Sequence, residues 1–510
     1  MRHSIKLGAI LGYISIILTT LVTLIFTPIL LDNLGTSEYG VYSLVASVIA
    51  YFSIFDVGLS STGIRYIAKN HKDQTKISQI NGLLLKIYTF ISLIILIAGI
   101  IIFFNIENIF TALTSTEVYK FKISFIIMIV SLAISFPFSV YNSYIIAKEE
   151  FMYNKVVSLL HNILKPFIMW PLLLLGFKSV GMIVVVAALN VLTYVANFVY
   201  AKYKLGFTCD LSKNPENKKI IKELFNFSFF IFLSMIVDVI FKNTDQVILG
   251  AFCGTFAVST YDVAMQIRTA NKNFSTVISS MFLPKLSKMV ENKEPMSKIS
   301  KIFNQVSRIQ MFILLLILSG FIIFGVQFIN LWVGNEYISA YYIALICIIP
   351  NFIPLSQNIG LSVIQAMNKH QFRAKMYLLI AILNVGISIP LSIKWQGVGA
   401  AIGTAIAVLL GQVITMNWYY SKKIGLDIKS YWLNILKIVC PVLVVSVIIK
   451  SLLDNYITSY ITLLIGIIIY TSIYCIYLYL VIMNEYEKGL IKKFLNIITK
   501  KFNIKKQNIN

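Results

Sequence analysis

Long apolar runs recur along the whole chain, and they limit its fold more than any other feature. Segments such as 90–104 and 311–324 hold almost no polar side chain, and charged residues make up only 13% of the sequence. A soluble domain carries about twice that share. In lipid, only helices and closed barrels pair every backbone group. Because the runs are about twenty residues long, they predict an all-α integral membrane protein.

Breaks between the apolar runs predict about fourteen transmembrane helices. The predicted spans are 7–31, 41–64, 81–104, 121–147, 152–175, 179–201, 223–250, 256–284, 302–329, 338–367, 374–393, 396–420, 430–450 and 456–483. An even number of spans places both termini on one side of the membrane.

The basic residues indicate which side that is. Most of the 44 lysines and arginines lie near the N-terminus, in every second connection after it, or in the C-terminal tail. The opposite connections hold only Lys120, Lys122, Lys178, Lys394 and Lys450. Cytoplasmic loops carry the excess of basic residues, so both termini are predicted to be cytoplasmic. The net charge of +23 then predicts contact with anionic phospholipids, and no nucleic acid partner is expected.

The two halves of the chain resemble each other. Gly35 and Thr36 recur as Gly254 and Thr255, and further matches bring each of the first six spans onto one of the next six. A six-span repeat keeps its orientation, which predicts two parallel six-helix bundles around a central cleft. The predicted domains are an N-terminal six-helix bundle (1–206), a cytoplasmic linker (207–222), a C-terminal six-helix bundle (223–425), an additional transmembrane hairpin (426–483) and a basic cytoplasmic tail (484–510).

Four basic residues lie deep in the predicted spans: Lys165, Lys242, Arg268 and Lys272. A cation at the bilayer centre costs about 2.5–3.5 kcal/mol, so these side chains must face carboxylates, water or a ligand. Arg268 and Lys272 share one face of their span without an acidic residue at that depth. A guanidinium in a low-dielectric cleft binds phosphate strongly, which favours a functional role for Arg268.

One face of the span 223–250 carries Asp238, Lys242 and Asp245, at spacings of four and three residues. The lysine could be clamped between the two carboxylates as a neutral structural unit. The same three residues could instead meet a ligand directly. The sequence leaves both alternatives open.

Three further polar residues mark other spans. Asp56 lies near the middle of its span, where it would pair with a basic residue across the cleft or bind a coupling cation. Arg65 lies at the cytoplasmic end of the same span. His161 is one helical turn before Lys165 and is predicted to be a hydrogen-bonded interior histidine more readily than a proton carrier.

Signatures of enzymes are not found in the sequence. It contains no P-loop, HExxH or GxSxG motif, and no DxD motif lies in an outer connection. Its five cysteines and four histidines are scattered, which predicts no metal site. We therefore expect no catalytic residues and no cofactor, and the sequence does not reveal whether a proton or sodium gradient is used.

Two motifs and the span layout resemble a known family. The segments FDVGLSSTGIRYIAK (55–69) and DQVILGAFCGT (245–255), with six, six and two spans, are similar to bacterial polysaccharide-biosynthesis flippases. These are O-antigen and capsule repeat-unit exporters of the multidrug/oligosaccharidyl-lipid/polysaccharide exporter superfamily. The resemblance implies a MATE-like arrangement of the bundles. It also implies transport of an undecaprenyl-diphosphate-linked oligosaccharide to the outer leaflet of the bacterial cytoplasmic membrane, beside glycosyltransferases and a glycan polymerase.

The resemblance also implies roles for the polar residues within the spans. Those implied to meet the diphosphate or acidic sugars in the cleft are Arg268, Lys272, Lys242 and Lys165. Those implied to pair with these cations or to couple an ion are Asp56, Asp238, Asp245 and His161, and Arg65 would lie at the cytoplasmic gate.

Three other functions fit the sequence less well. A multidrug/cation antiporter of the same fold should have an acidic cleft, whereas the deep basic residues here at least match the acidic ones. A membrane glycan polymerase or ligase usually needs a sizeable outer loop, and the outer connections are all short. A purely structural role would not require charged residues within the spans.

Overall fold

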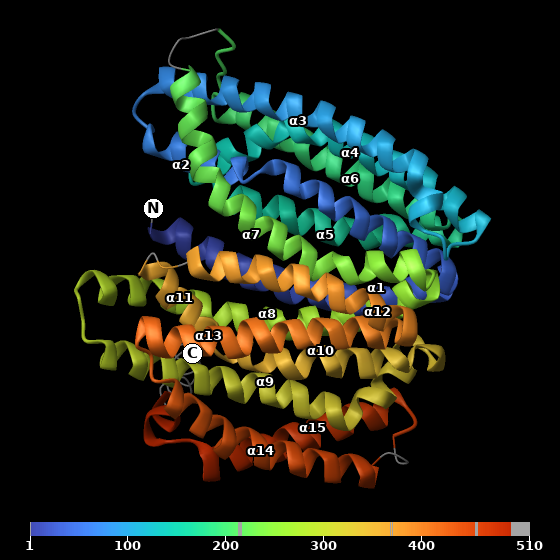
Figure 1. The fold of residues 1–510 in the computed structure, drawn as a ribbon, viewed down its shortest axis with the longest axis vertical. Coiled ribbons are helices and arrows are strands. Elements are labelled where there is room, and N and C mark those ends of the chain that lie inside the picture. Colours follow the sequence, from blue (N-terminus) through green and yellow to red (C-terminus); the bar gives the residue numbers. More distant parts are fainter. Residues whose placement is uncertain (1, 213–216, 368, 370, 454–456, 491–510) are drawn as a thin grey trace, which may run out of the picture. The chain divides into compact units, whose positions relative to one another are not determined.

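The computed structural model describes residues 2–212, 217–367, 369, 371–453 and 457–490. Within these ranges the chain is helical apart from short connections, and no strand occurs in them (Figure 1). The predicted all-α fold class is therefore confirmed. Residues 213–216 of the predicted linker and 491–510 of the predicted tail lie outside the described residues.

Fifteen α-helices form the described part of the chain. They are α1 (Arg2–Tyr51), α2 (Leu59–Lys69), α3 (Gln74–Ile109), α4 (Ser115–Ala147), α5 (Phe151–Leu174), α6 (Ser179–Val199), α7 (Asn217–Phe252), α8 (Thr255–Glu291), α9 (Met296–Val333), α10 (Ser339–Ser356), α11 (Asn358–Ala366), α12 (Gln371–Val408), α13 (Met416–Tyr419), α14 (Ile428–Leu453) and α15 (Tyr460–Tyr477). A short turn, η1 (Phe52–Asp56), lies between α1 and α2.

Ten helical segments of the described residues are long and apolar enough to cross a membrane. Two of them, 16–69 and 371–424, are 54 residues long, more than twice the roughly 20 residues that a single span needs. The first is interrupted at Gly35 and the second at Trp395 and Gln396, where the backbone is not helical. These interruptions coincide with breaks between predicted spans, although the total of fourteen spans stays a prediction.

The helices group into two compact units, and each is described by itself. The first unit comprises the described residues of 1–270, 342–347 and 370–411. The second comprises those of 271–341, 348–369 and 412–510. The predicted bundle boundaries and the cleft between bundles remain predictions.

In the first unit, α4 packs between α3 and α6, while α1 packs against α4, α5 and α7, and α7 packs against α12. Small residues allow the two arms of α12 to approach closely on either side of its interruption. A Cβ atom on Gly403 would lie 2.3 Å from the Ser388 hydroxyl oxygen, and one on Gly411 would lie 2.2 Å from Ile380. This is the close helix-packing face that the glycine spacing in this segment predicts.

In the second unit, α9 is contacted by α11, α14 and α15. The Tyr470 hydroxyl of α15 donates to the Ser319 hydroxyl at 2.6 Å, and Tyr474 donates to the Phe312 carbonyl at 2.7 Å. Both acceptors are on α9, so buried hydrogen bonds as well as apolar contacts attach the C-terminal hairpin to this helix.

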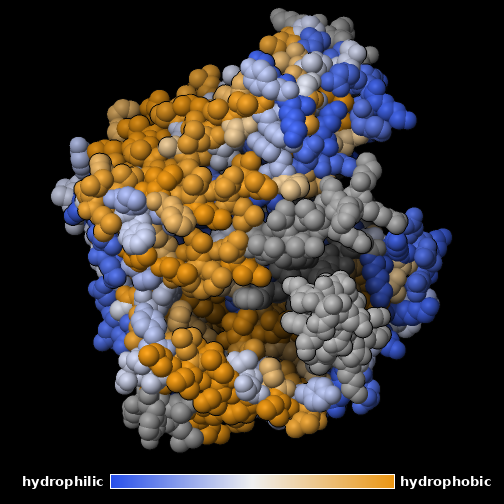
Figure 2. All heavy atoms as spheres, turned by 180° about the vertical axis from the view of Figure 1, so that it is seen from behind, coloured by the Kyte–Doolittle hydropathy of each residue, from blue (hydrophilic) through white to orange (hydrophobic). Residues whose placement is uncertain are grey.

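Large apolar side chains cover much of the molecular surface. Figure 2 shows hydrophobic residues spread over the face in view, with hydrophilic ones gathered towards its edges. Phe104, Leu175 and Ile461 are each at least 70% exposed. Water would oppose such exposure, whereas lipid tails solvate it, so the protein is a multi-pass membrane protein.

Candidate functional site

A carboxylate in the first unit organises a polar network among three helices. Asp262 of α8 accepts hydrogen bonds from Tyr39 of α1 at 2.5 Å, from Gln246 of α7 at 2.7 Å and from Gln266 of α8 at 3.0 Å. The Gln266 amide also donates to the Tyr39 hydroxyl oxygen at 2.8 Å. These donors satisfy the Asp262 carboxylate without a direct ion pair.

A lysine from a fourth helix lies beside this network. The ammonium group of Lys165, on α5, is 5.7 Å from the ring centre of Tyr42, and the Tyr42 ring centre lies 6.2 Å from that of Tyr39. The neighbouring His161 ring lies 3.1 Å from the Thr193 hydroxyl oxygen. The structure thus places Lys165 next to an anionic network, and it gives His161 an ordinary hydrogen-bond partner.

Sequence reasoning missed the residues that surround Lys165. Hydropathy alone does not single out Asp262, Tyr39 or Gln246. One signal was available. Asp262 is an ionisable residue within a span, and such residues usually face a protein interior or an aqueous cavity.

A second buried carboxylate is that of Asp245 on α7, which is only 4% exposed. Its Oδ2 atom accepts from the Thr404 hydroxyl of α12 at 2.6 Å and from the Tyr261 hydroxyl. Asn384 donates to Thr404 at 3.4 Å and accepts from Ser388 at 3.1 Å. Among the described residues, no hydrogen-bond donor reaches Asp245 Oδ1. The Asp245 carboxylate is therefore incompletely hydrogen-bonded, and side-chain oxygen atoms surround it.

The other two charged residues predicted on this face of α7 lie in a different setting. Asp238 and Lys242 are both exposed, whereas Asp245 is buried. The ion pairs found among the described residues do not include Lys242. The three side chains thus share a helix without forming a clamp around the lysine in this structure.

The two cations predicted on α8 also differ in their surroundings. Arg268 is half-buried, with a guanidinium nitrogen 3.4 Å from the Met265 sulfur. Lys272, in the second unit, has an exposed side chain. Arg268 is therefore the more enclosed of the two.

Asp56 is held by hydroxyl groups. Its Oδ1 atom accepts from Ser60 at 2.7 Å and from Tyr88 at 2.8 Å. The residue ends the η1 turn, and the next two residues, Val57 and Gly58, have positive φ angles that redirect the chain into α2. Arg65, on α2, is exposed.

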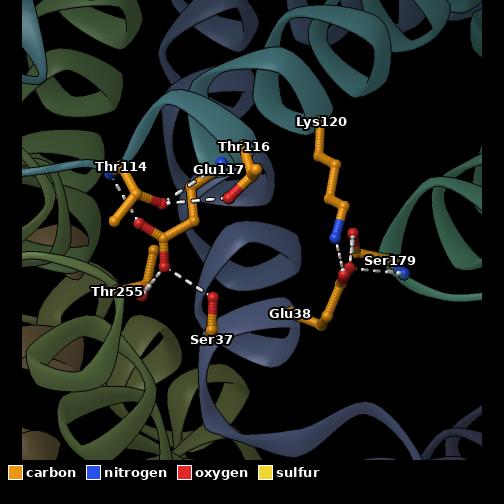
Figure 3. Close-up of polar contacts among 8 residues, drawn as sticks. All are labelled: Ser37, Glu38, Thr114, Thr116, Glu117, Lys120, Ser179 and Thr255. Atoms are coloured by element: carbon orange, nitrogen blue, oxygen red, sulfur yellow. Dashed lines mark hydrogen bonds and ion pairs between the residues drawn. The ribbon is translucent and has the colours of Figure 1, made fainter.

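A second group of carboxylates lies where α1, α4, α6 and α8 meet, and we call it the glutamate cluster (Figure 3). It consists of Ser37, Glu38, Thr114, Glu117, Lys120, Ser179 and Thr255. Glu117 Oε1 accepts from Ser37 at 2.5 Å and from Thr255 at 2.6 Å. Glu38 accepts from Lys120 and from the backbone and hydroxyl of Ser179. Two buried glutamates therefore tie these helix ends together.

Local sequence explains why Glu117 is placed there. The segment Thr114-Ser115-Thr116-Glu117 is a capping box, in which the Thr114 backbone N–H donates to Glu117 Oε2 at 2.8 Å. The N-terminus of α4 thus fixes the carboxylate, leaving Oε1 for Ser37 and Thr255. Gly40 lies close by, and a Cβ on it would be 2.2 Å from the Thr255 carbonyl oxygen.

Helix α2 contacts the N-terminal part of α7. The Thr62 and Ser228 hydroxyl oxygens are 2.7 Å apart. A Cβ on Gly58 would lie 2.8 Å from Ile231, so the backbone approaches α7 closely at this point. Helix α7 is therefore held by α2 near its N-terminus, whereas α8 begins at the glutamate cluster.

Comparison with protein families gives this geometry a context. The family described as polysaccharide biosynthesis protein matches residues 6–290, more than half of the chain. The chain belongs to the polysaccharide biosynthesis protein family. The resemblance proposed from the sequence is thereby confirmed.

Curated relatives of this family member are transporters. It is 23% identical to a putative O-antigen transporter of Shigella flexneri over 412 residues, which cover 79% of this chain and 94% of the relative. It is also 23% identical over 209 residues to a probable low-salt glycan biosynthesis flippase of Haloferax volcanii, covering 41% of this chain and 44% of that one. The prediction of a transporter rather than an enzyme is confirmed, so the polymerase or ligase alternative is dropped.

Solved structures share the fold of this polysaccharide biosynthesis protein. The lipid II flippase MurJ, in an inward closed conformation, superposes with a TM-score of 0.71 at 16% identity, over 92% of this chain and 98% of that one. An inward-facing multidrug transporter of the MATE family gives a TM-score of 0.60 at 14% identity, over 79% and 96% of the two chains. The predicted MATE-like fold is confirmed.

Proposed function

We propose that this protein flips undecaprenyl-diphosphate-linked oligosaccharide repeat units from the cytoplasmic to the outer leaflet of a bacterial cytoplasmic membrane. Family membership, the relatives named as an O-antigen transporter and a glycan flippase, and the fold shared with a lipid II flippase support this proposal. Both termini would be cytoplasmic. Glycosyltransferases would supply the substrate, and a glycan polymerase would use it afterwards.

The main structural support is the presence of cations that no carboxylate contacts directly. The Lys165 ammonium group lies 5.7 Å from the Tyr42 ring centre, and an Arg268 guanidinium nitrogen lies 3.4 Å from the Met265 sulfur. Neither cation forms a direct ion pair among the described residues, so each could pair with a diphosphate. A diphosphate binds more tightly than a single carboxylate because it offers more charge and more acceptor oxygens. Lys242 and Lys272 would join from exposed positions.

Alternating access requires the two helix ends to open in turn. In the proposed orientation, the glutamate cluster lies at the outer end and the contact of Thr62 with Ser228 lies at the cytoplasmic end. Uncharged donors satisfy Glu117, so its bonds can be exchanged for bonds to water when the outer end opens. The closed outer end would keep substrate from leaving until the cytoplasmic end has closed.

The deciding experiment measures flipping of a fluorescent undecaprenyl-diphosphate oligosaccharide in proteoliposomes. We would compare the wild type with Arg268→Ala, Lys272→Ala and Lys165→Ala. Lys422→Ala is the matched control, because Lys422 is an exposed lysine in a connection. We expect at least a tenfold loss for Arg268→Ala and Lys165→Ala, since each removes a charge-assisted contact worth about 1.5–3 kcal/mol. The control should flip normally.

Normal flipping by all three variants would show that Arg268, Lys272 and Lys165 do not bind the substrate. A multidrug/cation antiporter is the second candidate function, because a MATE transporter shares the fold and because Asp245 and Asp262 are membrane carboxylates. Failure of the wild type to flip the lipid, together with efflux of a cationic dye, would favour that second candidate.

We further propose Asp245 as the residue that couples transport to a proton or sodium gradient. Its unpaired Oδ1 atom and the nearby oxygens of Thr404 and Asn384 offer ligands for a proton or a small cation. Flipping should depend on sodium at fixed pH, or on pH without sodium, and Asp245→Asn should abolish that dependence. Identical gradient dependence in Asp245→Asn would exclude this role.

A further inference from the structure

A basic pocket lies in the second unit, between the last turns of α8 and the first turns of α9. Its volume is about 460 Å³. Four lysines line it, two from each helix: Lys285 and Lys288 from α8, and Lys298 and Lys301 from α9. Each pair has a spacing of three residues, which places both members on the same face of their helix.

The turn between the two helices explains why the four lysines converge. Lys293 adopts a left-handed conformation, with φ of 50°. Its N–H donates to the Val290 carbonyl at 3.1 Å, and the next N–H, that of Glu294, donates to the Met289 carbonyl at 3.0 Å. These two bonds form a Schellman motif, which ends α8 and reverses the chain tightly into α9. The lysine faces are therefore held opposite each other.

The charge in the pocket is poorly balanced by the protein. Glu294 is the acidic residue among the lining side chains, and its carboxylate lies 3.3 Å from the Lys298 ammonium group. The Lys298 side chain is 66% exposed and the Glu294 side chain is 30% exposed, so solvent weakens this ion pair. The other three lysines form none of the ion pairs found among the described residues.

The pocket also has an apolar part. Met289, which is 8% exposed, and Ile302, which is half-buried, line it beside the lysines. An inorganic anion would gain nothing from these two side chains. A molecule with a phosphate next to hydrocarbon would contact both kinds of surface.

We propose that this pocket binds the phosphate headgroup of an anionic phospholipid. It lies where α9, a helix long and apolar enough to cross a membrane, is joined to α8 by a tight turn. The sequence predicts this connection to be cytoplasmic, and basic pockets on the cytoplasmic side of membrane proteins bind such headgroups. The proposal depends on the chain spanning a membrane but not on which substrate it transports. The lysines fix the phosphate, and Met289 and Ile302 contact the adjoining hydrocarbon.

The test measures lipid bound to full-length protein by native mass spectrometry, after reconstitution with phosphatidylcholine and a minor fraction of cardiolipin or phosphatidylglycerol. The pocket variant carries Lys285→Gln, Lys288→Gln, Lys298→Gln and Lys301→Gln. The matched control carries Lys69→Gln, Lys72→Gln, Lys422→Gln and Lys423→Gln, four exposed lysines in other connections. We expect the pocket variant to bind anionic lipid at least tenfold more weakly, while the control binds as the wild type does.

Glu294→Gln gives a result of opposite sign that misfolding would not produce. Removal of the acidic lining residue should tighten anionic lipid binding by about threefold. If the pocket variant does not fold, Glu294→Gln becomes the deciding variant, and unchanged lipid binding by it would overturn the proposal. If the pocket variant folds, lipid binding equal to that of the control would overturn the proposal. Displacement of the lipid by millimolar inorganic phosphate would assign the pocket to a soluble anion and would also overturn it.

Discussion

The glutamate cluster depends on two individual residues, Glu117 and Glu38. Both side chains are less than 10% exposed, yet each reaches another helix. Hydroxyl and backbone donors satisfy Glu117, whereas Glu38 also meets a lysine. A buried carboxylate with this many donors is costly to disturb, because each donor would be left unpaired without it.

Glu117→Ala should separate the helices at the end where the glutamate cluster lies. Each lost hydrogen bond is worth about 0.5–1.5 kcal/mol, so three lost bonds should raise the open population about tenfold or more. A cysteine replacing Val258, which is fully buried on α8, would report this opening as faster labelling by a water-soluble maleimide. Glu107→Ala is the matched control, because the Glu107 side chain is 67% exposed.

Glu117→Gln should have a milder effect on the same labelling assay. Glutamine still completes the capping box with Thr114, so the start of α4 is preserved while the charge is lost. Unchanged labelling in both Glu117→Ala and Glu117→Gln would show that the glutamate cluster does not hold the outer end closed.

Arg308→Ala should destabilise the second unit strongly. The guanidinium of Arg308 donates to Glu487 at 2.6 and 3.0 Å and to Asn434 at 2.8 Å, and Glu487 is 3% exposed. Removing one partner of a buried ion pair costs about 3–5 kcal/mol, which thermal unfolding in detergent would detect as a lower Tm. Arg308→Met with Glu487→Leu should recover most of the loss, and Lys76→Ala at an exposed pair should have little effect. A Tm for Arg308→Ala equal to that of Lys76→Ala would contradict this assignment.

Residue-level prediction from the sequence rests on hydropathy. Hydropathy predicts that Lys165 and Arg268 lie within spans and need neighbouring polar groups. It could not give the direction in which each helix faces, and this is why Asp262 was missed as a neighbour of Lys165. Partners on α1, α5 and α8 are brought together only by tertiary packing, which no local pattern encodes.

At the scale of elements, interruptions within long helices define the architecture. Gly35 has a φ of 76°, which glycine adopts at little cost, and it divides α1 where two predicted spans meet. Trp395 and Gln396 divide α12 in the same way. The sequence predicted these positions because charged and polar residues interrupt the apolar runs there. It did not predict that α8 and α9 extend past their spans to build a basic hairpin, because hydropathy registers only the membrane-embedded part.

Gly40→Ala tests the close contact between Gly40 of α1 and Thr255 of α8. The added methyl group would lie 2.2 Å from the Thr255 carbonyl oxygen, so the two helices must separate. We expect faster maleimide labelling of the cysteine at position 258, as for Glu117→Ala. Gly320→Ala is the control, because nothing lies within 4 Å of a Cβ at that position. Equal labelling in both glycine variants would mean that the helices tolerate the methyl group without opening.

At the scale of the whole molecule, basic residues and apolar runs together describe a protein threaded repeatedly through lipid. The composition, the helical content and the family all agree on this point. The number of spans and their orientation follow from the alternation of basic connections, a statistical rule of membrane insertion. They therefore call for a direct measurement.

Cysteines placed in successive connections should react on opposite sides of the membrane. In a background without the exposed Cys209, Cys440 and Cys475, Lys122→Cys should react with an impermeant maleimide added to spheroplasts. Lys72→Cys and Lys422→Cys should react only after the membrane is permeabilised. Labelling of Lys122→Cys and Lys72→Cys from the same side would contradict the predicted span between them.

The hydrogen bond between Tyr39 and Asp262 joins residues 223 positions apart in the sequence. A ribosome adds about 5–20 residues per second, so Tyr39 is synthesised roughly 10–45 s before its acidic partner. During that interval the Tyr39 hydroxyl depends on water at the membrane boundary, on lipid, or on the insertion machinery. Biogenesis of this protein is therefore a matter of timing as well as of hydrophobicity, and slower translation between α1 and α8 would lengthen the vulnerable period.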